Sequence, residues 1–133
     1  MTAAAAPKPI SQAQKDEVLA IVVRHKDQPG PLIEILHDVQ RSLGYVPAEA
    51  VPLIAGALNL SRAEVHGVVS FYHYFHSAPH GRRVLRLCRA EACQSMKGRA
   101  LEQHAMKRLG IGFGETPADG AVALEAVYCL GLC

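Results

Sequence analysis

The sequence lacks several features that would assign it to a specialised class. No run of apolar residues approaches the length of about 18 that a transmembrane helix needs. Residues 1–7 have no basic region and too short an apolar stretch for a secretory signal peptide. We therefore expect a cytoplasmic protein with no direct membrane insertion, and we interpret residues 1–10 as a flexible leader.

Cysteine is absent from residues 1–87, and all four cysteines lie between residues 88 and 133. A disulfide framework needs an oxidising compartment, which the absence of an export signal disfavours. The sequence also offers no recognisable acid–base pair or nucleophile beside a substrate pocket, so we do not expect an autonomous enzyme.

The overall composition is ordinary for a folded protein. The 133 residues are 50% hydrophobic and 20% charged, which excludes a wholly disordered chain and suits one domain or two small ones. Residues 82–108 hold eight lysines and arginines against Glu91 and Glu102, a net charge of +6, while the remainder of the chain carries −4. This basic segment contains none of the interleaved aromatic residues that stack on single-stranded nucleic acid, so we expect no nucleic-acid partner.

The pattern of residues 11–80 predicts four helices. Ser11 with Gln14, and Ser61 with Glu64, have the spacing of capping boxes that begin helices. The second helix is expected to begin at Pro31 and to end before Gly44, and the third to cover residues 48–58. Apolar stripes mark the faces expected to be buried, at Val18, Leu19, Val22 and Val23 and at Leu32, Ile35, Leu36, Val39 and Leu43. We predict a helical docking domain over residues 11–80.

Residues 81–133 have a different pattern, which predicts strand, helix and strand. A strand over residues 83–87 leads to Cys88, and a loop carries Cys93. A helix follows over residues 97–109, and a second strand over residues 121–127 leads to Cys129. The side chains expected to share the buried face of that helix are Leu101, Ala105, Met106 and Leu109. Because ligands of open α/β sheets bind outside the carboxyl ends of the strands, we expect the cysteines to form one site there.

The cysteine spacing favours a binuclear iron–sulfur cluster. Four residues separate Cys88 from Cys93, three separate Cys129 from Cys133, and 35 lie between the two pairs. Structural zinc sites are also built from two cysteine pairs, usually with tighter spacing, so a zinc-stabilised interaction module remains the alternative. Longer hairpins suit the wider cluster, and a four-residue spacing occurs in plant-type ferredoxins.

The expected surroundings of the cysteines suit an anionic centre. The predicted helix beginning near Lys97 would direct its amino-terminal dipole toward Cys93. Arg86 and Arg89 flank Cys88, and nearby guanidinium groups would stabilise a reduced cluster. Residues 130–132 offer backbone amides to sulfur. We expect this basic face to meet an acidic partner surface or to screen the cluster.

Several segments resemble the thioredoxin-like [2Fe–2S] ferredoxins, a family that includes the E subunit of NADH:quinone oxidoreductase and related diaphorase modules. These segments are residues 44–47 (GYVP), 60–72 (LSRAEVHGVVSFY) and 127–133 (VYCLGLC). Residues 88–94 (CRAEACQ) differ from the threonine-rich loop of the respiratory E subunit. They are more similar to the gamma subunit of cytosolic, molybdenum-containing, NAD-dependent formate dehydrogenase.

The resemblance implies an α+β fold in which an N-terminal helical bundle precedes a thioredoxin-like α/β domain over residues 81–133. It implies one [2Fe–2S] cluster on Cys88, Cys93, Cys129 and Cys133, and no catalytic residue. The partners would be a diaphorase subunit that binds FMN and NAD and a larger catalytic subunit with a molybdenum cofactor and iron–sulfur clusters. The alternative assignments are the E subunit of the respiratory enzyme and the diaphorase of an NAD-linked hydrogenase.

The sequence departs from the family pattern at its end. In the family, two more strands and a helix complete the sheet beyond the fourth cysteine, whereas this sequence stops at Cys133. We therefore expect Cys133 to be the least firmly held ligand. A strand–helix–strand unit is also short of core, so we expect it to depend on the cluster, the helical half and its partner for stability.

Two weaker patterns are given structural interpretations. His73 and His76 have helical i, i+3 spacing within an aromatic stretch, and we prefer packing against the other half or a partner to metal binding. Gly110, Gly112 and Gly114 follow a predicted helix and do not open one, so the geometry is wrong for cradling phosphate.

Overall fold

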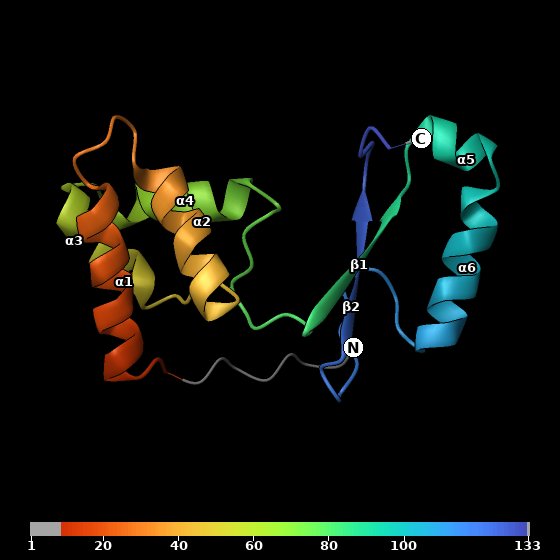
Figure 1. Cartoon of the computed structure of the whole chain (residues 1–133), viewed down its shortest axis with the longest axis horizontal. Helices are drawn as coiled ribbons and strands as arrows, with labels where there is room; N and C mark the ends of the chain where they lie inside the picture. The colour runs from red at the N-terminus through yellow and green to blue at the C-terminus, as the bar shows by residue number, and fades with distance from the viewer. Residues whose placement is uncertain (1–8, 133) are drawn as a thin grey trace. The chain divides into compact units, whose positions relative to one another are not determined.

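The structure is a computed structural model that describes residues 9–132. The chain divides into two compact units between Pro79 and His80, and each is described by itself (Figure 1). The first unit contains helices and the second combines two strands with two helices. This order confirms the predicted α+β fold.

The first unit consists of four helices whose ends are set by local sequence. These helices are α1 (Gln12–His25), α2 (Leu32–Leu43), α3 (Ala50–Leu58) and α4 (Arg62–Phe71). Both predicted capping boxes are formed, at the starts of α1 and α4. Gly44 and Asn59 end α2 and α3 in the left-handed conformation, with φ of 83° and 56°. Pro31 caps α2 from the position before its first residue.

The core of the helical unit lies among the facing sides of these helices. Ile35, Leu36 and Val39 of α2 are buried, as the sequence predicted. The prediction for α1 was partly wrong, because Leu19 and Val23 are exposed and Ile21 is buried in their place. The buried residues of α1 are Val18, Ile21 and Val22, which have the i, i+3 and i+4 spacing of one helix face.

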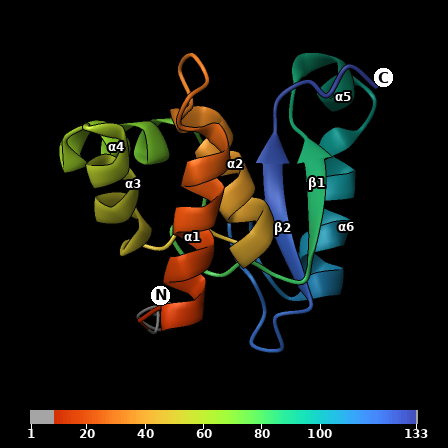
Figure 2. The ribbon, with the colours of Figure 1, turned by 60° about the vertical axis from the view of Figure 1, so that its left-hand side comes forward.

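The second unit is a parallel two-stranded sheet with helices between the strands in sequence. Its elements are β1 (Arg83–Cys88), α5 (Glu91–Ser95), α6 (Gly98–Leu109) and β2 (Val122–Val127). The register pairs Arg83 with Val122 and Cys88 with Val127. Figure 2 shows α6 running alongside the sheet, with α5 near the carboxyl ends of both strands. Cys88 and Cys129 lie at or just after these carboxyl ends.

Two predictions about local structure, both in the second unit, were wrong. Cys93 lies in the short helix α5, not in a loop. The end of α4 at Phe71 is not among these errors, and His73 and His76 lie after the helix. On α6, Leu101 is exposed and the neighbouring Glu102 is buried, because Glu102 finds polar partners in the same unit.

The predicted flexible leader falls mostly outside the described residues. Residues 1–8 of this segment are not described, so the prediction for them is untested. Ile10 is described and is buried, so the leader does not extend to residue 10.

The second unit has a small core, as its sequence predicted. Within residues 80–132, the buried hydrophobic side chains are those of Ala105, Ala123 and Leu124. The described part of the chain contains no helix long and apolar enough to cross a membrane.

Candidate functional site

The structure brings three of the four predicted cysteines to one end of the two-stranded sheet. Cys88 is the last residue of β1, and Cys129 follows the end of β2 by two residues. Because the strands are parallel, both leave the sheet at the same edge. Cys93 returns to this edge in α5. Cys133 lies outside the described residues.

The sulfur of Cys88 is surrounded by hydrogen-bond donors. The backbone N–H groups of Ala90 and Cys129 lower the pKa of the Cys88 thiol against the opposing effect of burial, and the Cys93 side chain and the Leu130 N–H contribute in the same direction. The N–H of Cys129 lies 3.2 Å from the Cys88 sulfur. This environment favours a thiolate, which is the form that binds iron.

A left-handed turn places two of these donors. Cys129 has a φ of 64°, which is uncommon for a residue other than glycine. Successive N–H groups around such a turn converge on one point and form a concavity that attracts anions. Here the N–H groups of Cys129 and Leu130 both act on Cys88. The prediction that backbone amides after Cys129 act on sulfur therefore holds for the Leu130 N–H. The Ala90 N–H is a further donor, which the sequence did not indicate.

Helix α6 contacts the backbone of Cys93 at its first residue. A Cβ atom on Gly98 would lie 2.7 Å from the carbonyl oxygen of Cys93, so only glycine allows this approach. Lys97 precedes α6 with a φ of 65°. Cys93 therefore lies beside the first residue of α6, near the helix start as its position in the sequence predicted, and contacts it through its backbone carbonyl.

The two arginines beside Cys88 both form ion pairs. Arg86 Nε lies 2.9 Å from a carboxylate oxygen of Glu125 on the neighbouring strand. Arg89 Nε lies 3.2 Å from Glu102, and its guanidinium group also stacks over the ring of Phe113. These carboxylates offset part of the positive charge that the sequence places near the cysteines.

A groove of about 750 Å³ opens beside the cysteines. Its lining includes Arg99 and the exposed ring of Tyr128, which directly precedes Cys129. Gly110, Gly112 and Gly114 are not part of this lining, and the N–H of Gly112 donates a hydrogen bond to the Glu115 carboxylate. The groove therefore offers a polar and aromatic surface close to the cysteine site.

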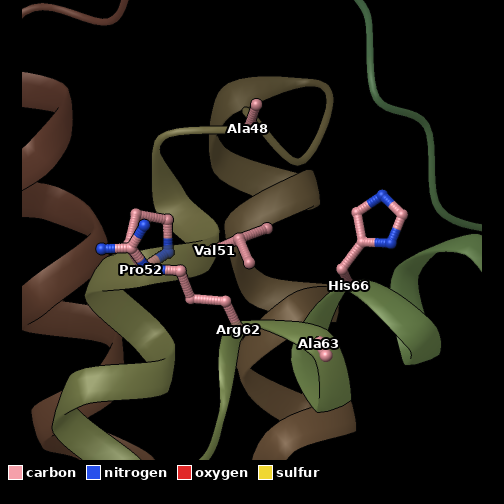
Figure 3. Close-up of a pocket in the computed structure, with 6 residues that line it drawn as sticks. All are labelled: Ala48, Val51, Pro52, Arg62, Ala63 and His66. Carbon is pink, nitrogen blue, oxygen red and sulfur yellow. The ribbon is translucent and has the colours of Figure 1, made fainter.

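The helical unit has a second cavity of about 500 Å³ between α3 and α4 (Figure 3). Small apolar side chains form most of its lining, and Arg62 and His66 supply its charged and polar groups. The lining holds no carboxylate, thiol or hydroxyl group to pair with His66 in catalysis. Its chemistry suits packing against another surface.

The chemistry of the cysteine site fits an iron–sulfur cluster, because three thiols and several backbone donors meet at one edge. A sequence model of the thioredoxin-like [2Fe–2S] ferredoxin family matches residues 18–133. The chain belongs to this family. The predicted [2Fe–2S] cofactor is thereby confirmed, and the zinc alternative loses its support.

Similar proteins are subunits of redox complexes. The E subunit of the NADH-quinone oxidoreductase of Pseudomonas aeruginosa is 33% identical over 124 residues, which are 93% of this chain and 75% of that protein. The HndA subunit of the NADP-reducing hydrogenase of Solidesulfovibrio fructosivorans is 33% identical over 118 residues, 88% of this chain and 68% of that protein. The alpha subunit of the NAD-reducing hydrogenase HoxS of Cupriavidus necator is 31% identical over 115 residues, 86% of this chain but 19% of that protein.

Proposed function

We propose that this ferredoxin is a non-catalytic electron-transfer subunit whose cluster is held by Cys88, Cys93, Cys129 and Cys133. The observation that carries the proposal is the convergence of three of these thiols at the carboxyl edge of the sheet, with backbone donors around Cys88. A bound [2Fe–2S] cluster accepts and donates one electron at a time.

The chain's own groups would hold the cluster and set its electrostatic environment. Backbone N–H groups that point at ligand sulfur stabilise negative charge there, which favours the reduced state. The ion pairs of Arg86 and Arg89 keep compensated charge beside the ligands.

The proposed electron partner is FMN on an NAD-binding diaphorase subunit. The surface around the cysteines supports a docking role, because Met96, Tyr128 and Leu132 are exposed there or close to it in sequence. Exposed large apolar side chains are typical of interfaces. We propose that the helical segment 11–80 docks as well, through surfaces such as the cavity between α3 and α4. A cytoplasmic location is part of the proposal.

We further propose that the complex is an NAD-dependent formate dehydrogenase with a larger molybdenum- and iron–sulfur-containing catalytic subunit. Support comes from residues 88–94 (CRAEACQ), which resemble the gamma subunit of such enzymes. The second candidate is a respiratory or hydrogenase complex, which the similar proteins favour.

Purification of the chain from its native cells, through an affinity tag and under anaerobic conditions, distinguishes these assignments. We expect a flavoprotein and a molybdenum-containing subunit to co-purify, and the complex to reduce NAD⁺ with formate. Co-purification with hydrogenase or quinone-reducing subunits, without formate-dependent activity, would support the second candidate and overturn the formate assignment.

A further inference from the structure

Helix α6 carries a buried carboxylate close to the cysteine site. Glu102 is 6% exposed, and it is the one buried charged residue of the described chain. A buried carboxylate is costly unless donors compensate it, so its partners show what it holds in place. Its Oε1 atom accepts hydrogen bonds from Arg89 Nε at 3.2 Å and from Gln94 Nε2 at 2.7 Å.

The two donors stand next to two different cluster ligands. Arg89 directly follows Cys88, and Gln94 directly follows Cys93. One oxygen atom of Glu102 therefore connects the end of β1 to α5 through α6. This connection fixes the spacing between the end of β1, which carries Cys88, and α5, which carries Cys93.

The backbones of both donors are held as well. The N–H of Arg89 donates to the carbonyl of Val127 at 2.7 Å, which continues the sheet ladder past Cys88. The N–H of Gln94 donates to the carbonyl of Ala90 at 3.0 Å. Each donor is therefore part of an ordered backbone segment that also carries the neighbouring cysteine.

The Gln94 side chain depends on Glu102 for its orientation. Its Oε1 atom is buried and has no hydrogen-bond partner among residues 9–132, so the hydrogen bond from Nε2 to Glu102 is what orients the amide. Loss of the carboxylate would leave both ends of the amide unpaired and would leave Arg89 held by its contact with the Phe113 ring alone among these two partners.

We propose that Glu102 is a positioning residue for the cluster, acting through Arg89 and Gln94 on Cys88 and Cys93. This inference rests on the proposed function and adds to it a residue that touches no ligand sulfur. Outer groups that orient metal ligands typically contribute about 10-fold to 100-fold in metal affinity. The carboxylate thus sets how firmly and in what geometry the cluster is held.

The test uses the full chain with its cluster, and the variants Glu102→Ala, Glu102→Gln and Gln94→Ala. Asp119→Asn is the matched control, because the Asp119 carboxylate in the same unit also accepts a hydrogen bond, from the Ala121 N–H at 2.9 Å, but stands before β2, at the opposite end of that strand from Cys129. The measurements are the rate of cluster loss to an iron chelator, the midpoint potential and the EPR spectrum of the reduced protein.

We expect Glu102→Ala to lose its cluster about 10-fold faster than the wild type or more. Gln94→Ala should also lose its cluster faster than the wild type, but by a smaller factor than Glu102→Ala. The rate for Glu102→Gln should lie between those of the wild type and Glu102→Ala, because its amide oxygen can still accept one hydrogen bond. The EPR spectrum of Glu102→Ala should change, while that of Asp119→Asn should not. A merely structural role would lower thermal stability and leave the spectrum unaltered.

The inference is overturned if Glu102→Ala and Gln94→Ala keep the wild-type rate of cluster loss and the wild-type spectrum, or if Asp119→Asn changes both as much as Glu102→Ala does. Should Glu102→Ala fail to fold, Gln94→Ala decides by the same criteria. If the wild-type chain holds its cluster and the variants behave like it, this inference is wrong but the proposed function stands. If the wild-type chain holds no iron, the proposed function itself is contradicted.

Discussion

Single contacts at the residue scale determine the geometry of the cysteine site. The left-handed conformation of Cys129 turns backbone donors toward Cys88. The missing side chain of Gly98 lets α6 lie against the carbonyl of Cys93. These features act over a few ångströms, so they can be changed one at a time.

The Gly98→Ala substitution should destabilise the second unit. The added Cβ atom would lie 2.7 Å from the Cys93 carbonyl oxygen, and backbone atoms cannot move aside as a flexible side chain can. We expect a loss of about 1–3 kcal/mol in the free energy of unfolding. Urea unfolding of the chain, followed by the visible absorption of the cluster, measures the effect.

The control for this substitution is Gly67→Ala on α4. A Cβ atom there would meet nothing within 4 Å, and Gly67 is exposed. Alanine is the better helix former by about 1 kcal/mol, so this variant should gain stability in urea unfolding followed by circular dichroism. Equal behaviour of the two variants would show that the close approach at Cys93 does not constrain the chain.

At the scale of elements, the local sequence sets where each helix begins and ends, and side-chain pairs then join one helix to another. His25 at the end of α1 lies 2.8 Å from a carboxylate oxygen of Asp38 on α2, and Arg41 pairs with the other oxygen at 2.6 Å. The hydrogen bond from His25 lowers the pKa of Asp38, and the charge of Arg41 acts in the same direction against burial. The Asp38 carboxylate thereby links α1 to α2.

The Asp38→Asn substitution should remove a pH-dependent part of the stability. Because the pKa of Asp38 is lowered on folding, its contribution is complete above the unfolded pKa of about 3.9 and is lost as the pH falls through the lower folded pKa. We expect a loss of about 1–2 kcal/mol near neutral pH. Urea unfolding at a series of pH values should show the gap between wild type and variant closing in acid.

The exposed Asp27 provides the comparison for this experiment. Asp27→Asn should change the free energy of unfolding by less than about 0.5 kcal/mol at every pH. A constant gap between Asp38→Asn and wild type from neutral to acidic pH would contradict the role assigned to the carboxylate.

Local signals explain which elements were predictable from sequence. The Ser11 and Ser61 capping boxes and the Gly44 and Asn59 ends depend on residues within one turn, and the structure forms all of them. Helix α5 was missed because five residues are too few to show a helical period. Parallel pairing of the strands brought Cys88 and Cys129 together as the topology predicted.

Long-range contacts explain what the sequence could not predict at the site. Glu102 was counted as a charge in the basic segment, but its burial depends on Arg89 and Gln94, which lie 13 and 8 residues away. The same pairing rotates α6 so that Leu101 faces outward. The Gly98 contact with Cys93 likewise gives no sequence signal until α5 and α6 are placed together.

At the scale of the whole molecule, the two units differ in what holds them together. The helical unit has a cluster of thirteen buried residues, whereas residues 80–132 bury the hydrophobic side chains of Ala105, Ala123 and Leu124. A unit with so little core gains much of its stability from a bound metal group. The stability of the second unit should therefore follow its cofactor.

Removal of iron should loosen the second unit selectively. In hydrogen exchange followed by mass spectrometry, a chelator should reduce the protection of amides in β1, β2 and α5 by about 10-fold or more. Amides of α1, α2 and α3 should keep their protection, which serves as the internal control. Unchanged protection in β1 and β2, or an equal loss in both units, would contradict a cofactor-dependent second unit.

Iron and acid-labile sulfide analysis of the purified full chain, combined with EPR, tests the central claim most directly. The account predicts about two irons and two sulfides per chain and a signal of a reduced [2Fe–2S] cluster. Serine substitution of Cys88, Cys93 or Cys129 should abolish or strongly alter this signal, and Cys133→Ser should weaken it. A colourless chain with one zinc ion, or an unaltered cluster after substitution of these cysteines, would contradict the account.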